Sequence, residues 1–247
     1  MIKQGRAAIL LGLLLLSAVH AAAPLTSVQL QTLVVTGKVW GFLKYHHPAV
    51  TAGGRNWDQE LLDHLPALLA ARSSSAMQRQ LAEWVDSLGP VAPCAPCVQL
   101  APGDLQTRPR LGWLADRTLL GPKLSGQLRA IYQNRVAGQQ AYVRLAEAGN
   151  ADFETDAGFA QAEYPNRAYQ VLGTLRYWNI IEYWFPYRDL IDEDWDAVLR
   201  DALPRLADAP DAVTYQRELM ALIARSDDGH ATLGSSMRLR EPVGDCH

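Results

Sequence analysis

Basic clusters and cysteines are both scarce in this chain of 247 residues. Its 23 Lys and Arg residues stand against 26 Asp and Glu residues, and the net charge is −3. No basic block is interleaved with aromatic residues, which argues against nucleic acid as a partner. The chain is instead rich in apolar residues, at 49%, with seven Trp and nine Tyr. This composition favours a large helical core, and an aromatic-lined binding groove is the alternative.

Long apolar runs are also absent beyond the N-terminal segment, so we expect a soluble mature protein. The N-terminus itself has the pattern of a signal peptide, with Lys3 and Arg6 followed by AAILLGLLLLSAV, too short for a mature membrane helix, and then by VHA. We predict that residues 1–21 are removed by cleavage after Ala21 or within two residues of it. An uncleaved anchor is the alternative. The exported protein would be periplasmic in a Gram-negative bacterium, or secreted.

Export allows the few cysteines to form a disulfide. The stretch PCAPC places Cys94 and Cys97 in a proline-rich segment, and we predict a structural disulfide between them. A thioredoxin-like redox pair is a second interpretation, but it needs a preceding strand and a helix that begins at the first cysteine. A metal knuckle is a third, and it would have to recruit Cys246 and His247.

The chain contains an internal duplication. The stretch KVWGFLKYHHPAV resembles RYWNIIEYWFPYR, and NWDQELLDHLPALLAA resembles DWDAVLRDALPRLADA, both at an offset of 138 positions (178 − 40). A constant offset over about sixty residues is hard to obtain by chance, so residues 27–89 and 165–227 are interpreted as two copies of one module. The matched pairs include Trp40 with Trp178, Tyr45 with Tyr183, Pro48 with Pro186, Trp57 with Trp195 and Pro66 with Pro204.

Each copy is predicted to form three helices. In the first copy one helix covers residues 30–45, and the next begins after Asn56, which matches Asp194 as an N-cap. Pro66 should kink this second helix or end it early, because proline removes a backbone hydrogen bond. Gly89 suits the C-terminus of the third helix. The apolar face of this third helix holds Met77, Leu81, Trp84, Val85 and Leu88 in the first copy, and Tyr215, Leu219, Leu222 and Ile223 in the second.

The segment between the copies is rich in Pro and Gly. We expect a short helix at SGQLRAIYQNR, a strand at QAYVRLA and a turn at GNADFETD. The predicted fold is therefore mainly α, with two copies of a three-helix module joined by a proline-rich segment that holds a small β element. The expected divisions are the signal peptide 1–21, repeat one 22–89, the linker 90–164, repeat two 165–234 and an irregular tail 235–247.

Metal sites have little support in the sequence. His46, His47 and His64 form no HExxH pattern and no pair spaced by four residues. His47 aligns with Phe185 across the duplication, which favours packing over metal binding. We predict neither a metal nor a cofactor.

His230 is the candidate catalytic residue. In ARSDDGHATLGSS it follows the second copy, whereas the first copy ends in WVDSLGP, without a histidine. A residue needed only for packing would more often have a counterpart in both copies. Asp227 and Asp228 are supporting candidates, because a carboxylate stabilises a protonated imidazole. The alternative is a structural histidine at a helix end, bonded to one of the two carboxylates.

Five stretches resemble one protein family: GKVWGFLKYHHPAV, NWDQEL, LRYWNIIEYWFPYRDLI, DWDAVL and ARSDDGHATL are similar to the helical N-terminal region of tricorn-like and C-terminal-processing serine peptidases. The resemblance covers essentially the whole mature chain, in order. It implies a PDZ-like domain and an α/β catalytic domain after the helical region. In tricorn-like members the histidine of the HA step is a general base, a position matched by His230. Those sites also have a serine before the histidine, where this chain has Gly229.

The resemblance implies peptide-bond hydrolysis with a nucleophilic serine downstream of this chain. Ser235 and Ser236 are the nearest hydroxyls to His230, but they are too close in sequence and lack a glycine-flanked nucleophile turn. This chain alone is then expected to be inactive, with a peptide or protein as the substrate of the full enzyme. The alternative is a self-contained periplasmic helical module that binds a peptide or protein without catalysis. Sequence beyond position 247 would separate the two.

Overall fold

The computed structural model describes residues 23–95, 97, 109–135, 140–147, 149, 151–153, 164–229 and 231. The predicted signal peptide, most of the tail and His230 lie outside the described residues. The fold is mainly α, as predicted. Its elements are α1 (Ser27–His46), α2 (Pro48–Thr51), α3 (Trp57–Leu69), α4 (Ser74–Ser87), η1 (Gly112–Ala115), α5 (Arg117–Gln133), β1 (Arg144–Leu145), β2 (Ala151–Asp152), α6 (Arg167–Trp184), η2 (Arg188–Leu190), α7 (Trp195–Ala207) and α8 (Ala212–Ala224).

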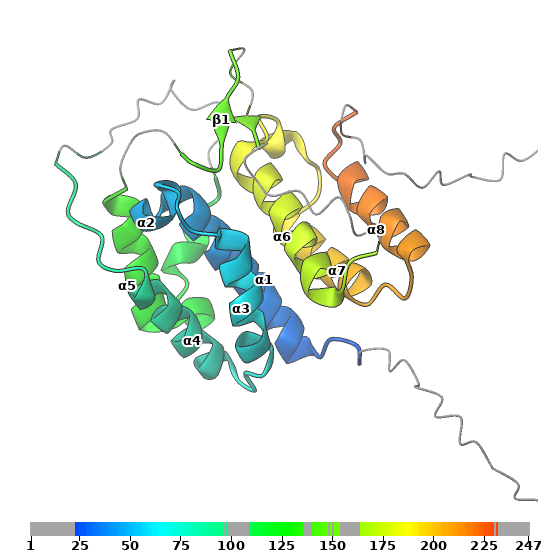
Figure 1. Ribbon diagram of the computed structural model, residues 1–247, viewed down its shortest axis with the longest axis horizontal. Helices are drawn as coiled ribbons and strands as arrows, with labels where there is room; N and C mark the ends of the chain where they lie inside the picture. The colour runs from blue at the N-terminus through cyan, green and yellow to red at the C-terminus, as the bar shows by residue number, and fades with distance from the viewer. Residues whose placement is uncertain are drawn as a thin grey trace, which may run out of the picture.

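Two long helices, α1 and α6, form the centre of the molecule. They lie side by side, with α3, α4 and α5 beyond α1 and with α7 and α8 beyond α6 (Figure 1). Every residue from 32 to 45 in α1 is buried, including Lys38 and Lys44. Most of these residues are apolar, and a helix that is largely apolar all round belongs in the interior, which explains its central position. Among the described residues, no helix is long and apolar enough to cross a membrane.

The second helices of the copies, α3 and α7, have bounds that differ by 138 at both ends, and α4 and α8 begin at the same offset. Their N-caps also correspond. The side chain of Asn56 accepts a hydrogen bond in α3, and that of Asp194 does so in α7. Ser73 and Asp211 cap the third helices in the same way, each accepting from the backbone N–H three residues on. Because these caps satisfy orphan donors, each copy specifies its helix starts locally.

A reciprocal pair of tryptophans joins the first two helices of each copy. The indole N–H of Trp40 donates to the carbonyl of Trp57 at 3.0 Å, and that of Trp57 donates back to the carbonyl of Trp40 at 3.1 Å. Trp178 and Trp195 repeat the arrangement at 2.7 and 3.0 Å. All four side chains are buried. Each copy thus satisfies two buried indole donors without water.

The helices α1 and α6 contact one another through corresponding residues. A side chain on Gly37 would collide with Leu175, and one on Gly41 would collide with Asn179. The amide of Asn179 donates to the Gly37 carbonyl at 3.1 Å. One turn further on, the rings of Tyr45 and Tyr183 lie 5.2 Å apart. Because the contacts Gly37–Leu175, Gly41–Asn179 and Tyr45–Tyr183 each join positions 138 apart, the two helices run parallel about an approximate two-fold axis. The glycines are required there to let the backbones approach.

The segment between the copies differs from the prediction in two respects. The expected short helix is the end of a longer one, α5, which begins at Arg117 and is kinked at Gly121, where φ is +72°. Gly121 and Pro122 look like helix breakers, yet Asp116 caps the helix before them, so the element continues through the kink. The expected turn also contains a strand. β2 pairs with β1 in antiparallel register, with Arg144 opposite Asp152.

Prolines inside α3 and α7 end these helices without breaking them earlier. Pro66 and Pro204 each lie three residues before the last helical residue. The prolines therefore lie in the last turn of each helix, where the missing N–H removes one backbone hydrogen bond.

Candidate functional site

The turn after α8 carries the sequence-predicted catalytic motif. Asp227 has φ +54°, and it is the one residue other than glycine with a positive φ in the described part of the chain. Its counterpart in the first copy is Gly89, with φ +87°. Left-handed backbone favours glycine, and a side chain there costs energy. The second copy therefore has a carboxylate at a position where the first copy has glycine, which adopts this backbone conformation without strain.

Polar contacts anchor this turn, among them ion pairs of Arg225 that the first copy lacks at the matching position, Ser87. The guanidinium of Arg225 pairs with Glu193, with Nε 2.8 Å from Oε1, and with Asp201 at 2.6 Å. Ser226 is buried, and its hydroxyl donates to the Ile223 carbonyl at 2.8 Å. The first copy has Ser87 and Leu88 at the two matching positions. The end of α8 is thus tied to the start of α7 by charge.

Tyr177 completes the anchor from α6. Its phenol donates to the Ser226 hydroxyl at 3.0 Å. Burial raises the pKa of Tyr177, so the phenol stays protonated and remains a donor at neutral pH.

The candidate acidic residues, Asp227 and Asp228, shortly precede the catalytic candidate in the sequence. Asp227 is exposed and Asp228 is half-buried. The backbone N–H of Ala231 donates to the Asp228 carbonyl at 3.0 Å. His230 itself and the hydroxyls of Ser235 and Ser236 lie outside the described residues. The approach of either carboxylate to the imidazole therefore stays a prediction.

The cysteine pair is placed as a disulfide, with the Cα atoms of Cys94 and Cys97 4.7 Å apart. Neither a strand before Cys94 nor a helix beginning at it is present in the described residues, so the context of a thioredoxin-like redox site is missing. Cys246 and His247 lie outside the described residues. Within the part that the structure describes, no group of three or more His, Cys, Asp or Glu side chains is arranged to hold a metal ion.

The three histidines of the first copy, His46, His47 and His64, take part in packing. His46 stacks on Phe42 at 4.6 Å between ring centroids, and burial lowers its pKa to about 4. His47 caps α2 by accepting from the backbone N–H of Ala49 at 3.2 Å. His64 stacks on Trp84 at 4.3 Å. Burial also lowers the pKa of His47 and of His64, so neutral imidazoles are favoured at all three positions.

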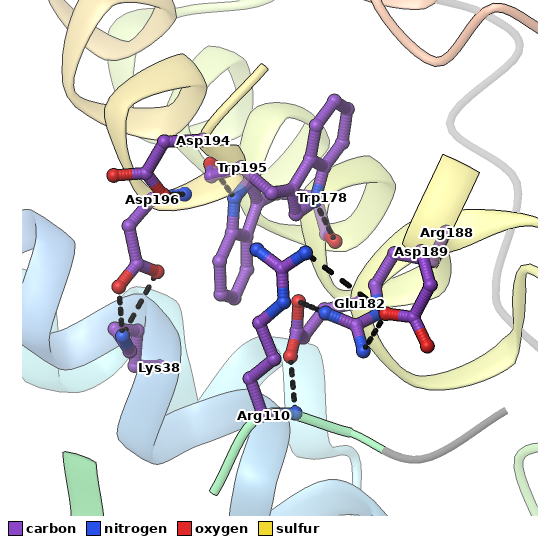
Figure 2. A network of polar contacts seen from close by, with 9 residues as sticks. All are labelled: Lys38, Arg110, Trp178, Glu182, Arg188, Asp189, Asp194, Trp195 and Asp196. Carbon is purple, nitrogen blue, oxygen red and sulfur yellow. Dashed lines mark hydrogen bonds and ion pairs between the residues drawn. The ribbon is translucent and has the colours of Figure 1, made fainter. Parts of the chain in front are cut away.

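A buried network of charges, not predicted from the sequence, lies where α1, α6 and α7 meet. Figure 2 shows the ammonium of Lys38 on the Asp196 carboxylate, at 2.8 and 2.6 Å. The Lys38 side chain is buried, and its ammonium also lies 5.1 Å from the centre of the Trp113 ring. Such a cation is stable in the interior because it is both paired and bonded.

The same network continues along α6 through Glu182. Its carboxylate accepts from the backbone N–H of Arg110 at 2.8 Å and lies 3.4 Å from the guanidinium of Arg188, which also reaches Asp189 at 2.8 Å (Figure 2). Arg188 is 1% exposed. Burial raises the pKa of Glu182, while the Arg110 N–H and the Arg188 charge act in the opposite direction. Each carboxylate has a cation beside it, so the arrangement is suited to holding α6 in place and not to proton transfer.

The Lys38 ion pair has a counterpart on the other side of the approximate two-fold axis. Arg176 corresponds to Lys38, and Asp58 corresponds to Asp196, at the same offset of 138 (176 − 38 and 196 − 58). Arg176 pairs with Asp58 through Nε at 3.3 Å and through its terminal nitrogen. Each copy therefore sends a cation from its first helix to a carboxylate on the second helix of the other copy. The signal in the sequence is the few charged residues, such as Lys38 and Arg176, within helices that are otherwise largely apolar.

Comparison of the chain with models of protein families, with curated proteins and with solved structures finds no match. Function therefore has to be inferred from the residues and their geometry. Of the two charged regions, the network in Figure 2 is internally neutralised, whereas the turn after α8 carries the exposed Asp227 and the half-buried Asp228, which precede His230 in the sequence.

Proposed function

We propose that this chain is the helical N-terminal part of an exported serine peptidase, with His230 as the general base for peptide-bond hydrolysis. The nucleophilic serine is supplied by a later part of the same polypeptide, after a PDZ-like domain. The proposal rests on the resemblance of the five stretches quoted above and on the anchored turn that leads to His230. Its site of action is the periplasm or the extracellular space, in keeping with the signal-like N-terminus.

The observation that carries the proposal is the backbone of Asp227. A side chain in the left-handed region costs free energy, though less for aspartate than for most residues, and such strain gathers at functional sites. Gly89 avoids this cost at the corresponding place in the first copy. Retention of a carboxylate three residues before His230 is explained if the carboxylate acts on the imidazole.

The chemistry follows from the charges of this turn. His230 removes the proton of the attacking hydroxyl, and the resulting imidazolium is stabilised by Asp227 or Asp228. Gly229 replaces the serine that tricorn-like sites carry next to the histidine, so this chain supplies no hydroxyl there. Arg225 and Ser226 hold the turn against α6 and α7, which limits the positions that the imidazole can reach.

The test uses the full-length protein encoded in the source genome, with a peptide substrate. His230→Ala should lower turnover by several orders of magnitude, as loss of a triad base does, and leave the circular dichroism unchanged. His64→Ala is the control, because that ring packs on Trp84 and has no part in the reaction. The 247-residue chain alone should neither cleave peptides nor react with serine-directed phosphonates.

Two outcomes would contradict the proposal. One is wild-type turnover in the full-length His230→Ala variant, which would point to a lysine-assisted serine. The other is an in-frame natural stop after position 247 without downstream catalytic sequence, which would favour the self-contained binding module.

A further inference from the structure

In the first copy, part of the linker covers the turn between α1 and α3, residues 47–56, which includes α2. Residues 140–143, here called the covering segment, lie across it. The backbone N–H of Ala141 donates to the Thr51 carbonyl at 2.9 Å, and the phenol of Tyr142 donates to the Arg55 carbonyl at 2.7 Å. Ala141 also lies so close to Gly53 that a side chain on Gly53 would meet it at 2.8 Å. This turn is thus bound by a short stretch of chain through backbone bonds and small apolar contacts.

The corresponding turn of the second copy, residues 185–194, carries large apolar side chains at its surface. Tyr187 is 62% exposed and Leu190 is 74% exposed. They stand where the first copy has Ala49 and Ala52 (187 − 138 and 190 − 138). Large apolar groups close together on a surface are typical of interaction sites. Among the described residues, the second copy therefore has exposed apolar side chains on this turn, whereas the linker covers the matching turn of the first copy.

The charge of this turn indicates what would cover it. Four acidic residues accompany one arginine, Arg188, which is buried and already paired with Glu182 and Asp189. The acidic residues are Asp189, Asp192, Glu193 and Asp194, and all four are exposed. Asp189 pairs with Arg188, Glu193 pairs with Arg225 and Asp194 caps α7, so Asp192 is the acidic residue of this turn for which no ion pair or side-chain hydrogen bond is found among the described residues. The matching stretch of the first copy has Arg55 and no acidic residue. An apolar surface with an acidic rim is complementary to an apolar segment that carries basic residues.

We propose that the turn at residues 185–194, with Tyr187 and Leu190 at its surface, docks an extended peptide segment that is apolar and basic, in the manner of the covering segment on the first copy. The Asp189 carbonyl takes the place of the Thr51 carbonyl as acceptor of a backbone N–H from the peptide. Apolar side chains of the peptide pack on Tyr187 and Leu190, and a flanking Lys or Arg faces Asp192. This binding is independent of the proposed hydrolysis.

The chain itself supplies the probe. The peptide QAYVRLA, residues 140–146, contains the covering segment, alternate apolar residues and one arginine. Labelled at its N-terminus and titrated with the full chain, it should bind saturably by fluorescence anisotropy. The double variant Tyr187→Ser/Leu190→Ser should weaken binding by about tenfold or more, because both apolar anchors are lost. The control is Val213→Ser/Met220→Ser, which removes two apolar side chains of lesser exposure from α8 and should leave binding unchanged.

A second peptide tests the charge. QAYVELA, with the arginine replaced by glutamate, should bind about tenfold more weakly, and this difference should shrink at high salt. Equal binding of the two peptides would overturn the basic character of the partner. Absence of saturable binding, or equal loss in the control variant, would overturn the docking surface. Self-association that the Tyr187→Ser/Leu190→Ser variant abolishes, without peptide binding, would assign the surface to a second copy of the chain and overturn the proposal as well.

Discussion

The two copies of the helical module share their framework and differ in individual residues at the surface and in the interior. Both have the reciprocal tryptophan pair, capped helix starts and a positive φ after the third helix. Features that occur in both copies are therefore explained by the fold. Features present in one copy alone, such as Asp227 and the exposed Tyr187, need a further reason, and the duplication serves as an internal control for function.

The interior shows how far the copies have diverged. Lys44 in α1 corresponds to Glu182 in α6 (182 − 44), and both are buried. The ammonium of Lys44 lies 5.2 Å from the centres of the Trp40 and Tyr142 rings, whereas Glu182 is held by Arg110 and Arg188. Opposite charges at one position of the same framework are tolerated because each has acquired its own neighbours. A shared framework thus fixes where a group lies, but not its chemistry.

The largest effect should come from breaking the framework equally in both copies. Trp40→Ala and Trp178→Ala should each lower the free energy of unfolding by about 3–5 kcal/mol, because a large buried side chain and an indole bond are lost. Urea unfolding followed by circular dichroism measures both. The two variants should unfold in a single transition, since α1 and α6 share one interface. Two separate transitions in either variant would show that the copies unfold independently and would contradict the shared centre.

A pH titration of stability tests a position at which the copies differ, which is His46 in the first copy and Trp184 in the second. Burial holds the pKa of His46 near 4 in the folded protein, while an unfolded histidine titrates near 6.5. Below pH 6.5 the unfolded state therefore binds the proton more readily, and stability falls as the pH drops towards 4, by up to about 3 kcal/mol. The slope should vanish above pH 7.

The His46→Phe variant isolates this contribution. It retains the stack on Phe42, and its stability should fall less than that of the wild type between pH 6.5 and 4. Parallel curves for the two proteins would show that folding does not lower the pKa of His46.

The paired ionic links test the approximate two-fold axis. Double-mutant cycles on Lys38→Met with Asp196→Asn, and on Arg176→Met with Asp58→Asn, should each give a coupling of about 2 kcal/mol. The Asp58 side chain is 9% exposed and the Asp196 side chain is 35% exposed, so the second cycle should give the larger value. Coupling near zero in both would mean that the cross-links contribute nothing to the contact between the copies.

Local signals predicted the framework well. The N-caps Asn56 and Asp194 and the glycine after α4 are recognisable because their roles depend on neighbours within a few residues. The constant offset between the matching tryptophans predicted the repeat. The link between Lys38 and Asp196 spans 158 positions, and no periodicity in either helix reveals it.

The candidate site was predicted less completely than the fold. The motif pointed to His230, Asp227 and Asp228, but the left-handed backbone of Asp227 is invisible in the sequence, because aspartate is common in ordinary turns. Alignment of Asp227 with Gly89 across the duplication does indicate that position 227 favours glycine. Tyr187 and Leu190 lie in stretches used above only for the duplication and the family resemblance, and their exposure depends on what the linker covers.

The smallest effect concerns the turn that separates the copies most sharply. Asp227→Gly should raise the free energy of unfolding by about 1 kcal/mol or less, because relief of the left-handed side chain is partly offset by the greater freedom of glycine in the unfolded chain. The reverse exchange in the first copy, Gly89→Asp, should lower stability by a similar amount, since the φ there is +87°. Thermal unfolding of the two variants measures both signs. In the full-length protein Asp227→Gly should nevertheless slow peptide hydrolysis, whereas Gly89→Asp should not. A more stable variant with lower turnover is the pattern expected when strain is retained for function. A stable Asp227→Gly variant with unchanged turnover would reduce Asp227 to an ordinary turn residue and remove the main structural support for a catalytic role of this motif.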